Sequence, residues 1–192
     1  MKYAVLADKQ YSYLSYAVVP IRREDMPLIK EWRNAQIDVL RQARPLTDED
    51  QRRYYEEAVL PTFSQTEPRM LLFSYLLDGR LIGYGGLTNL DWVNRRAEIS
   101  FLLETSRTGE RNRIQYEADF SAFLTLMKRI AFGELKLNRL FTETYDIRPW
   151  HVAVLEKNGF RPEGRMRQHV RIRGEYVDSL LHGCLAEEND HV

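Results

Sequence analysis

The chain has little cysteine, no long apolar run and no excess of charge, and each shortage excludes a class of protein. Its one cysteine, Cys184, cannot form a disulfide within the chain. The apolar neighbours of Cys184 in "SLLHGCL" favour a buried structural thiol over a nucleophile. No run approaches the roughly 18 apolar residues of a membrane span. The opening "MKYAVLADKQ" contains an aspartate and no long apolar core, so we expect no secretory signal and a cytoplasmic location.

Charge of one sign is also missing. Lysine and arginine total 28, as do aspartate and glutamate, so the chain has no net field that would attract nucleic acid or anionic lipid. The four histidines, His151, His169, His182 and His191, lack the close spacing of metal ligands, and Cys184 has no partner cysteine. We therefore expect no nucleic-acid partner, no membrane partner and no metal.

What is present is enough apolar material for a core. Of the 192 residues, 44% are hydrophobic, which predicts one domain spanning residues 1–192. No internal repeat or low-complexity segment divides it. We expect residues 1–19 to form an N-terminal extension and residues 186–192 to be a frayed tail. Composition leaves both a monomer and a homodimer open.

Two helices are predicted in the first third of the chain. "REDMPLIKEWRN" has Asp25 as an N-cap candidate, with Ile29 and Trp32 at helical spacing. "LTDEDQRRYYEEAVL" begins at Thr47 with a Thr-x-x-Asp pattern close to a capping box. Before them, "YAVLA" and "YSYLSYAVVPIR" flank residues 8–10, and we expect them either to pair as a hairpin or to lead into the first strand.

The pattern then changes to strands and returns to helices. "RMLLFSYLL" and "RLIGYGGLTNL" meet across the Asp-Gly pair at 78–79, a strong hairpin signal, and "AEISFLLE" supplies another strand. Residues 116–135 show a long apolar helical pattern, "NRLFTETY" reads as a strand, and residues 149–158 read as a helix. Two strands around the Arg-Gly pair at 173–174 close the chain. This order predicts the α/β class, with a mixed central sheet flanked by helices.

Four short motifs carry a resemblance to a known family. They are "WRN" early in the chain, "GYGGL" on a central strand, "AEISF" on the next strand and "VLEKNGF" late in the chain. With the order of elements, they resemble the GNAT superfamily of acetyl-CoA-dependent N-acetyltransferases from about Pro20 to Leu185. "LEKNGF" is similar to the branch that contains ribosomal-protein N-terminal acetyltransferases and sugar-nucleotide N-acetyltransferases. Other branches carry a tyrosine general acid where this chain has Leu155. The resemblance implies acetyl-CoA as co-substrate and a small-molecule amine as acceptor.

The resemblance also implies a pyrophosphate loop before a helix, with the pattern Arg or Gln, two residues, Gly, one residue, Gly or Ala. Alignment from "AFGEL" places "QYEADF" there; Gln115 matches, but Ala118 and Phe120 replace both glycine-type positions. The alternative is that "SRTGERNR" shapes the anion site, with Gly109 for flexibility and arginines for charge. A solvated basic loop is an equally simple interpretation of that stretch. The cofactor-binding candidates are Phe101, Leu102, Leu103, Arg111, Arg113, Gln115 and Arg148.

Acetyl transfer to an amine needs a base, polarisation of the thioester carbonyl and a proton for the leaving thiolate. Strand alternation places Glu98 on one face with Ser100, and this carboxylate is the leading base candidate. Tyr145 is a candidate proton donor to the thiolate, and His151, at the first turn of a helix, is a candidate acid, base or cofactor contact. Each also has a structural interpretation: Glu98 as a hydrogen-bonding group of the strand, Tyr145 as a packed aromatic and His151 as a polar helix cap. Backbone N–H groups of residues 98–103 are expected to polarise the carbonyl, because a parallel strand pair splays there in this fold.

The acceptor side is predicted from polar residues on the first helix and the last strand. By resemblance, Arg33 and Asn34 of "WRN" contact the acceptor, and Asp178 and His182 share a face of the last strand. An arginine run beside the predicted cleft suits phosphates, which favours an amino sugar, in particular a nucleotide-linked one. The run consists of Arg161, Arg165, Arg167, Arg171 and Arg173. Two rivals stay open, acetylation of a protein N-terminus and a non-catalytic binding module that keeps the fold.

Overall fold

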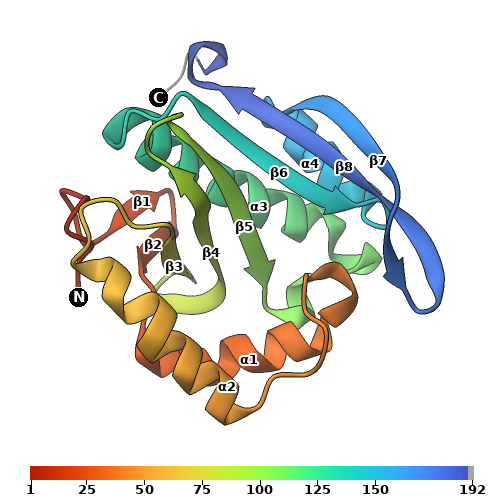
Figure 1. The fold of residues 1–192 in the computed structure, drawn as a ribbon, viewed down its shortest axis with the longest axis horizontal. Helices are drawn as coiled ribbons and strands as arrows, with labels where there is room; N and C mark the ends of the chain where they lie inside the picture. Colours follow the sequence, from red (N-terminus) through yellow and green to blue (C-terminus); the bar gives the residue numbers. More distant parts are fainter. Residues whose placement is uncertain (190–192) are drawn as a thin grey trace.

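One mixed sheet contains the strands of residues 1–189, the part of the chain that the structure describes, in the order β1-β2-β3-β4-β5-β6-β8-β7 (Figure 1). The structure is a computed structural model. Neighbouring strands run antiparallel except β5 and β6, which run parallel. The predicted α/β class with a mixed central sheet is confirmed. The strands are β1 (Tyr11–Tyr13), β2 (Tyr16–Pro20), β3 (Leu71–Leu77), β4 (Arg80–Asp91), β5 (Arg96–Leu103), β6 (Arg139–Tyr145), β7 (Arg161–Ile172) and β8 (Glu175–Leu185).

Helices flank this sheet. Figure 1 shows α3 and α4 behind it and α1 and α2 along its lower edge. Against the sheet, the ring of Phe120 on α3 stacks on that of Phe101 on β5, with centroids 4.4 Å apart. π-Helical turns continue α2 over Tyr54–Val59 and α3 over Arg129–Glu134. The α-helices are α1 (Met26–Ala35), α2 (Asp48–Arg53), α3 (Arg113–Lys128) and α4 (Pro149–Lys157).

The two predicted helix caps have different outcomes. Thr47 forms the capping box, since its hydroxyl accepts from the N–H of Asp50 and the carboxylate of Asp50 accepts from the N–H of Thr47. Asp25 precedes α1, but its side chain does not cap the helix. Its buried carboxylate instead accepts hydrogen bonds from Arg22 (2.6 Å) and from the hydroxyl of Ser74 (2.6 Å). The prediction at Asp25 is wrong because these partners hold the carboxylate away from the helix terminus.

Two predicted hairpin turns are confirmed, and a third is displaced. The Asp-Gly pair at 78–79 has φ angles of 48° and 78° and joins β3 to β4. The Arg-Gly pair at 173–174 has φ angles of 50° and 91° and joins β7 to β8. Positive φ at both central residues matches the twist of a two-residue hairpin. The first hairpin turns next to Leu14, between β1 and β2, so the alternative with a hairpin across residues 8–10 is wrong. The other alternative, in which this segment leads into the first strand, agrees with β1 beginning at Tyr11.

Residues 1–19, which we expected to be an extension, contribute strands to the sheet. β2 pairs antiparallel with β3 along its whole length. The buried hydroxyl of Tyr3 donates to the carbonyl of Leu72 (2.7 Å) and accepts from the N–H of the same residue (2.9 Å). At the other end, Ala186–Glu188 form a short 3-10 turn. Residues 190–192 of the predicted frayed tail lie outside the described residues.

The parallel strands β5 and β6 separate in the middle of the sheet. Their ladder has three residue pairs and ends at the pair Glu98–Phe141. β5 nevertheless continues to Leu103 and β6 to Tyr145, so the two strands diverge as a V (Figure 1). Among residues 1–189, no strand pairs with the facing edges of the V beyond this point. The V therefore supplies hydrogen-bonding groups to a ligand that enters it.

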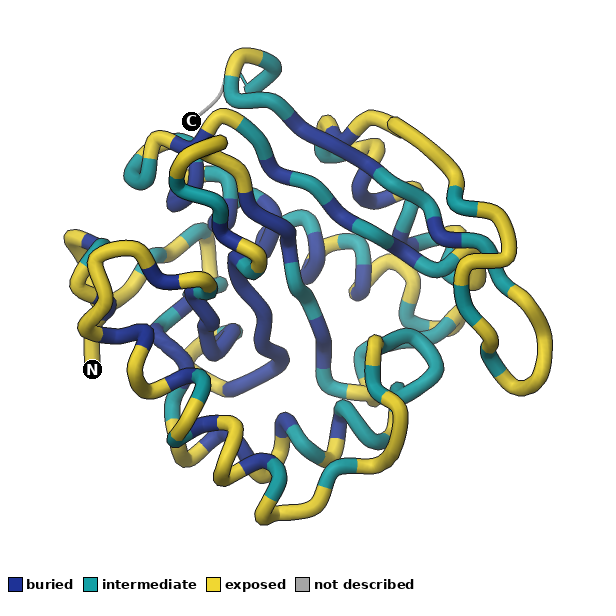
Figure 2. The backbone as a smooth tube through the Cα atoms, viewed as in Figure 1, coloured by how far each residue is buried: buried dark blue, intermediate teal, exposed yellow. Residues whose placement is uncertain are grey.

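The most buried strands lie at the centre of the sheet. Figure 2 shows the strands at its centre buried along much of their length, whereas β7 is mostly exposed. The glycines of "GYGGL" allow close strand packing, because a Cβ on Gly86 would lie 1.9 Å from the carbonyl oxygen of Leu71. Cys184 is a buried free thiol, as predicted. Within residues 1–189, the structure has no helix that is both long and apolar enough to span a membrane.

Candidate active site

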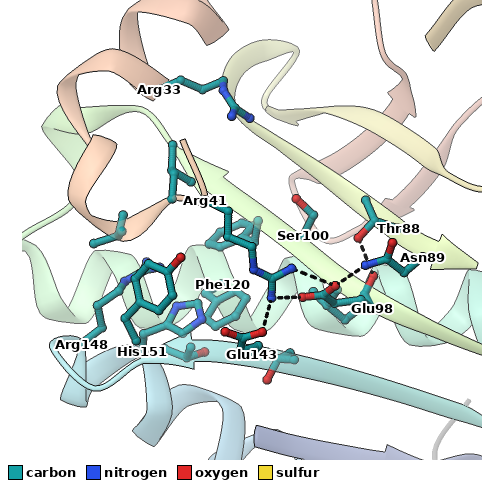
Figure 3. A pocket seen from close by; sticks show the side chains of 17 residues that line it. Arg33, Arg41, Thr88, Asn89, Glu98, Ser100, Phe120, Glu143, Arg148 and His151 are labelled. Carbon is teal, nitrogen blue, oxygen red and sulfur yellow. Dashed lines mark hydrogen bonds and ion pairs between the residues drawn. The ribbon is translucent and has the colours of Figure 1, made fainter. Parts of the chain in front are cut away.

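A pocket of about 220 Å³ lies where β5 and β6 separate. Side chains from both strands line it, together with the linker after α1, the end of β4 and the start of α4. Figure 3 shows these side chains converging on one space. The three predicted catalytic residues, Glu98, Tyr145 and His151, all line this pocket.

Arg41 bridges two carboxylates in the pocket. Its Nη2 atom lies 2.7 Å from Oε1 of Glu98 and 2.8 Å from Oε2 of Glu143 (Figure 3). Asn89 donates a second short hydrogen bond to Glu98, with 2.6 Å between Nδ2 and Oε2. Glu98 is 7% exposed, so its buried charge is paired as a buried carboxylate requires. The side chain of Arg41 is half exposed, so the cationic partner comes from the solvent side.

Strand register places the two carboxylates on the same face of the sheet, two positions apart. Glu98 pairs with Phe141, and Glu143 follows Phe141 by two residues, so side-chain alternation directs both carboxylates to the same face. The linker that carries Arg41 is held by Asn34, which accepts from the N–H of Leu46 (2.7 Å) and donates to its carbonyl (2.9 Å). The carboxylate pair is therefore set by the sheet, and its arginine by the linker.

A second group of polar side chains lies at another wall of the pocket, which His151 and Arg148 line. Tyr116 is buried and contacts both of them without lining the pocket itself. The hydroxyl of Tyr116 lies 2.7 Å from Nδ1 of His151 and accepts from Nη2 of Arg148 at 2.7 Å. The imidazole stacks on the ring of Phe120, with centroids 4.3 Å apart. Burial, and then the charge of Arg148, lowers the pKa of His151 well below its ordinary value. Burial raises the pKa of Tyr116, against the opposing effect of Arg148. His151 is therefore a neutral imidazole near pH 7.

Tyr145 lies on β6 beside this group. Burial raises the pKa of its phenol, and the charge of Arg41 opposes the rise. A phenol that stays protonated can donate a hydrogen bond or a proton to a leaving thiolate. The catalytic roles of Glu98, Tyr145 and His151 remain predictions, made more specific by their common place in one pocket.

The loop before α3 is where the sequence predicts a pyrophosphate site. The alignment of "QYEADF" with this loop is wrong, because residues 115–120 lie inside α3, which begins at Arg113 rather than at the predicted residue 116. The stretch that precedes α3 is "SRTGERNR", in which Gly109 has a φ of 95°. The side chain of Asn112 does not cap the helix, and the N–H of Arg113 donates to the carbonyl of Glu110 in the preceding 3-10 turn. The next N–H groups of the first turn have no side-chain cap from Asn112.

Asp119, which is fully buried, anchors this loop. Its carboxylate accepts from Nε of Arg107 (2.8 Å), from Nε2 of Gln115 (3.0 Å) and from the hydroxyl of Tyr16 (2.9 Å). These hydrogen bonds hold each of the three donors in place around the carboxylate. Arg107 and Gln115 are therefore directed to Asp119 in this structure.

The other predicted cofactor residues are distributed between the loop and the strand. Arg111 is exposed on the loop, and Arg113 is exposed at the first position of α3. Phe101 and Arg148 line the pocket. Residues 102–103 are buried in β5, where both pair with β4 and the carbonyl of Leu103 accepts from Nε2 of Gln36 (2.8 Å).

The four predicted acceptor contacts do not come together. Arg33 lines the pocket. Asn34 fixes the linker after α1, as described above. Asp178 pairs with an arginine of β7 on the outer hairpin, and His182 is buried near α4. Asp178 and His182 both lie on the last strand, β8, as predicted. Neither residue lines the pocket.

The arginine run on the outer hairpin is engaged with neighbouring groups. Arg161, Arg165 and Arg173 each form an ion pair with an aspartate or a glutamate. Arg171 lies over the ring of Tyr176, 6.0 Å from its centroid. None of the run lines the pocket at the V. The structural support for a phosphate on the acceptor is therefore weak.

Four residues that make these contacts were not predicted as site residues, namely Arg41, Asn89, Tyr116 and Glu143. Arg41 lies on a linker without periodicity, so no pattern marks it. Glu143 does carry a signal, because it shares a strand face with Tyr145 in "FTETYD". Among residues 1–189, no group of three or more His, Cys, Asp or Glu side chains is arranged to hold a metal ion.

The chain is similar to several known proteins. The family described as the acetyltransferase (GNAT) domain matches residues 18–181. A Bacillus subtilis protein named "Putative ribosomal N-acetyltransferase YdaF" is 29% identical over 136 residues, which cover 70% of this chain and 70% of that protein. The spermidine N-acetyltransferase from Vibrio cholerae in complex with CoA and spermine has a TM-score of 0.76 at 17% identity, over 92% of this chain and 98% of that chain. A structure named "Probable acetyltransferase" has a TM-score of 0.69 at 23% identity, over 98% of each chain.

Proposed function

Because the chain belongs to the acetyltransferase (GNAT) domain family and is thus an acetyl-CoA-dependent N-acetyltransferase, we propose that its acceptor is a cationic primary amine bound between Glu98 and Glu143. The observation that carries this proposal is the pair of carboxylates at the point where β5 and β6 separate. An alkyl amine is an ammonium ion at neutral pH, and carboxylates form strong charge-assisted hydrogen bonds with it.

The donor fits the V between β5 and β6. The pantetheine arm of acetyl-CoA carries amide groups, and the facing edges of the two strands have backbone groups without a partner strand. Such pairing needs no particular side chain. The first turn of α3 and the exposed Arg111 and Arg113 offer N–H groups and positive charge to the pyrophosphate. We therefore assign the donor to the V and the loop before α3.

The guanidinium of Arg41 occupies the position that we assign to the acceptor ammonium (Figure 3). Its side chain is half exposed and comes from a linker, so its departure leaves the sheet intact. An incoming ammonium would replace one cation between Glu98 and Glu143 by another, which keeps the local charge balanced. The Vibrio cholerae structure contains spermine, a polyamine, which supports a cationic acceptor.

The proposed reaction has three steps. Glu98 takes a proton from the ammonium, directly or through a water, and so frees the nitrogen lone pair. The amine then attacks the thioester carbonyl, a C–N bond forms, and backbone N–H groups of β5 stabilise the oxyanion. Finally the C–S bond breaks, the former amine nitrogen gives its second proton to water, and the thiolate takes up a proton. Glu98 then passes its own proton to solvent, so that the reaction releases one net proton.

Acetylation assays with the purified chain test the acceptor class. Acetyl-CoA is the donor, and the acceptors are spermidine, spermine, a peptide with a free N-terminus and a nucleotide-linked amino sugar. We expect the highest kcat/KM with the polyamines. A higher value for the nucleotide-linked sugar would move the acceptor to the amino-sugar class, and a higher value for the peptide would favour the activity in the name of the Bacillus subtilis relative.

Acetyl-CoA binding tests the donor site separately. A ligand that binds only the native state stabilises it by about 2.7 kcal/mol at a concentration of about 100 times its Kd. Calorimetric titration and the unfolding temperature should therefore both respond to acetyl-CoA. Binding without turnover of any amine would favour the non-catalytic module, and no response at millimolar acetyl-CoA would refute the donor site.

A further inference from the structure

The hydrogen bonds of Tyr116 fix which nitrogen of His151 carries the proton. Arg148 can only donate, so the oxygen of Tyr116 accepts from it at 2.7 Å. Within residues 1–189, the hydroxyl hydrogen then has one acceptor in reach, Nδ1 of His151 at 2.7 Å. A hydrogen aimed elsewhere would be buried without an acceptor, because Tyr116 is 1% exposed. Nδ1 is therefore an acceptor, and the proton of the neutral imidazole is on Nε2.

The Nε2–H group belongs to the pocket. The His151 ring lines the pocket, and in residues 1–189 its hydrogen-bonded nitrogen is Nδ1. On the same helix, one turn further, Leu155 is buried and has no proton to give. This wall of the pocket thus presents an imidazole N–H that is backed by a phenol.

We propose that Tyr116, acting through His151, supplies the proton that the leaving thiolate of CoA takes up. The proposal rests on the proposed function, because it requires acetyl-CoA in the V between β5 and β6. As the C–S bond breaks, its electron pair stays on sulfur, and sulfur takes the proton from Nε2. In the same step Nδ1 takes the hydroxyl proton of Tyr116, so the imidazole stays neutral.

The negative charge ends on the oxygen of Tyr116, next to the guanidinium of Arg148 that already donates to it. Water returns the proton to Tyr116 after the products leave. His151 is the catalytic residue in this scheme, since it contacts the leaving group. Tyr116 and Arg148 are positioning residues that fix its tautomer and stabilise the charge that the step creates.

The groups around His151 favour this route over a protonated ring. Arg148 at the start of α4 and His182 on β8 both disfavour an imidazolium, in addition to the effect of burial. On the pocket side, the ring shares its space with Glu143 and Tyr145. A relay through a neutral imidazole creates no second cation beside Arg148.

The test compares Tyr116→Phe and His151→Gln with the wild-type chain, using acetyl-CoA and the best acceptor of the assay above. Tyr116→Phe keeps the ring and removes one hydroxyl. We expect kcat to fall about a hundredfold or more in each variant, as for loss of a general acid, with the KM for acetyl-CoA nearly unchanged. The double variant should lose no more than the single variants, because the two residues act as one unit. An unchanged kcat in Tyr116→Phe would overturn the proposal.

Tyr75→Phe is the matched control. Tyr75 is also fully buried, and its hydroxyl donates to the backbone carbonyl of Asp119 on α3 at 2.7 Å. Tyr75→Phe should lower the stability of the chain as Tyr116→Phe does, but it should leave kcat unchanged. Equal losses of kcat in both variants would show that Tyr116 acts only through packing, which would overturn the proposal.

Two further readouts separate proton transfer from structure. With p-nitrophenyl acetate as donor, the leaving group needs no proton, so Tyr116→Phe should lose much less activity than with acetyl-CoA. Nitrogen NMR of the wild-type imidazole should show a protonated Nε2 and an unprotonated Nδ1. The opposite tautomer, or an equal loss with both donors, would overturn the proposal. Failure of the proposed function looks different, since wild-type chain would then not bind acetyl-CoA or would acetylate no amine.

Discussion

Glu98 of β5 and Phe141 of β6 form the last residue pair between the two strands, and the catalytic groups that we assign lie at and beyond this pair. On its other side, β5 stays paired with β4, from Thr88–Glu98 to Gly83–Leu103. Glu98 is therefore held by both neighbouring strands, while its side chain lines the pocket that begins at this pair. A carboxylate at the end of a ladder can thus be rigid and still be reached by an acceptor.

Replacing Glu98 by glutamine should lower kcat/KM for the acceptor by about a hundredfold or more, because glutamine keeps the shape but cannot take the ammonium proton. The measurement is kcat/KM against pH. Glu104→Gln is the matched control, since Glu104 follows β5 directly and pairs with the exposed Arg80. A Glu98→Gln variant that kept both the rate and the pH profile would leave the proton to water.

Replacing Arg41 by glutamine should lower the KM for a polyamine, because the variant no longer competes for the two carboxylates. We expect about a fivefold change, which corresponds to the ~1 kcal/mol of a partly exposed ion pair. Arg44→Gln is the control, since Arg44 lies on the same linker and pairs with Asp50. A higher KM in Arg41→Gln would mean that Arg41 binds the acceptor directly.

Replacing Arg111 and Arg113 together by alanine should weaken acetyl-CoA binding, with a loss that shrinks as salt rises. Both side chains are exposed, so their contacts with phosphate are screened. Calorimetric Kd values at several salt concentrations measure the effect. The double variant of Arg52 and Arg53, two exposed arginines on α2, is the control. Equal affinities of the double variant and the wild-type chain for acetyl-CoA at every salt concentration would show that these arginines are solvated and do not contact phosphate.

The free energy of unfolding should fall as the pH drops below about 6.5, the ordinary pKa of histidine. Burial and Arg148 lower the pKa of His151 in the native chain. Below about pH 6.5 the unfolded chain therefore binds more protons than the native chain. The contribution of His151 to stability is complete above this pH and is lost as the pH falls below it. Urea unfolding at several pH values measures the slope. His151→Gln should flatten the curve, whereas His169→Gln, at an exposed position, should not.

The parts of the fold that depend on neighbouring residues were predictable from the sequence. The Asp-Gly pair at 78–79 fixes a hairpin because the turn needs two positive φ angles. Thr47 caps α2 because both partners of the box lie within one turn. The start of α3 was placed too late, since Ile114 is 89% exposed and no apolar periodicity marks the first turn.

Contacts between distant segments explain what the sequence did not reveal about the site. Arg41 is 57 residues from Glu98 in the chain, and the path of its linker depends on Asn34. Tyr116 reads as one apolar position of a long helix, and its partners His151 and Arg148 come from α4. Glu98, Tyr145 and His151 were predicted as catalytic candidates because their residue types suit the chemistry, and all three line the pocket.

Asp119 makes the start of the chain a structural part of the donor side. Its carboxylate accepts from Tyr16 of β2 and from Arg107 of the loop before α3. None of residues 1–20 lines the pocket. A chain shortened to begin after β2 would nevertheless leave Asp119 with one donor fewer and β3 with an open edge. A truncation designed from the pocket residues alone would therefore remove the first strands and also loosen the loop before α3, to which we assign the phosphates.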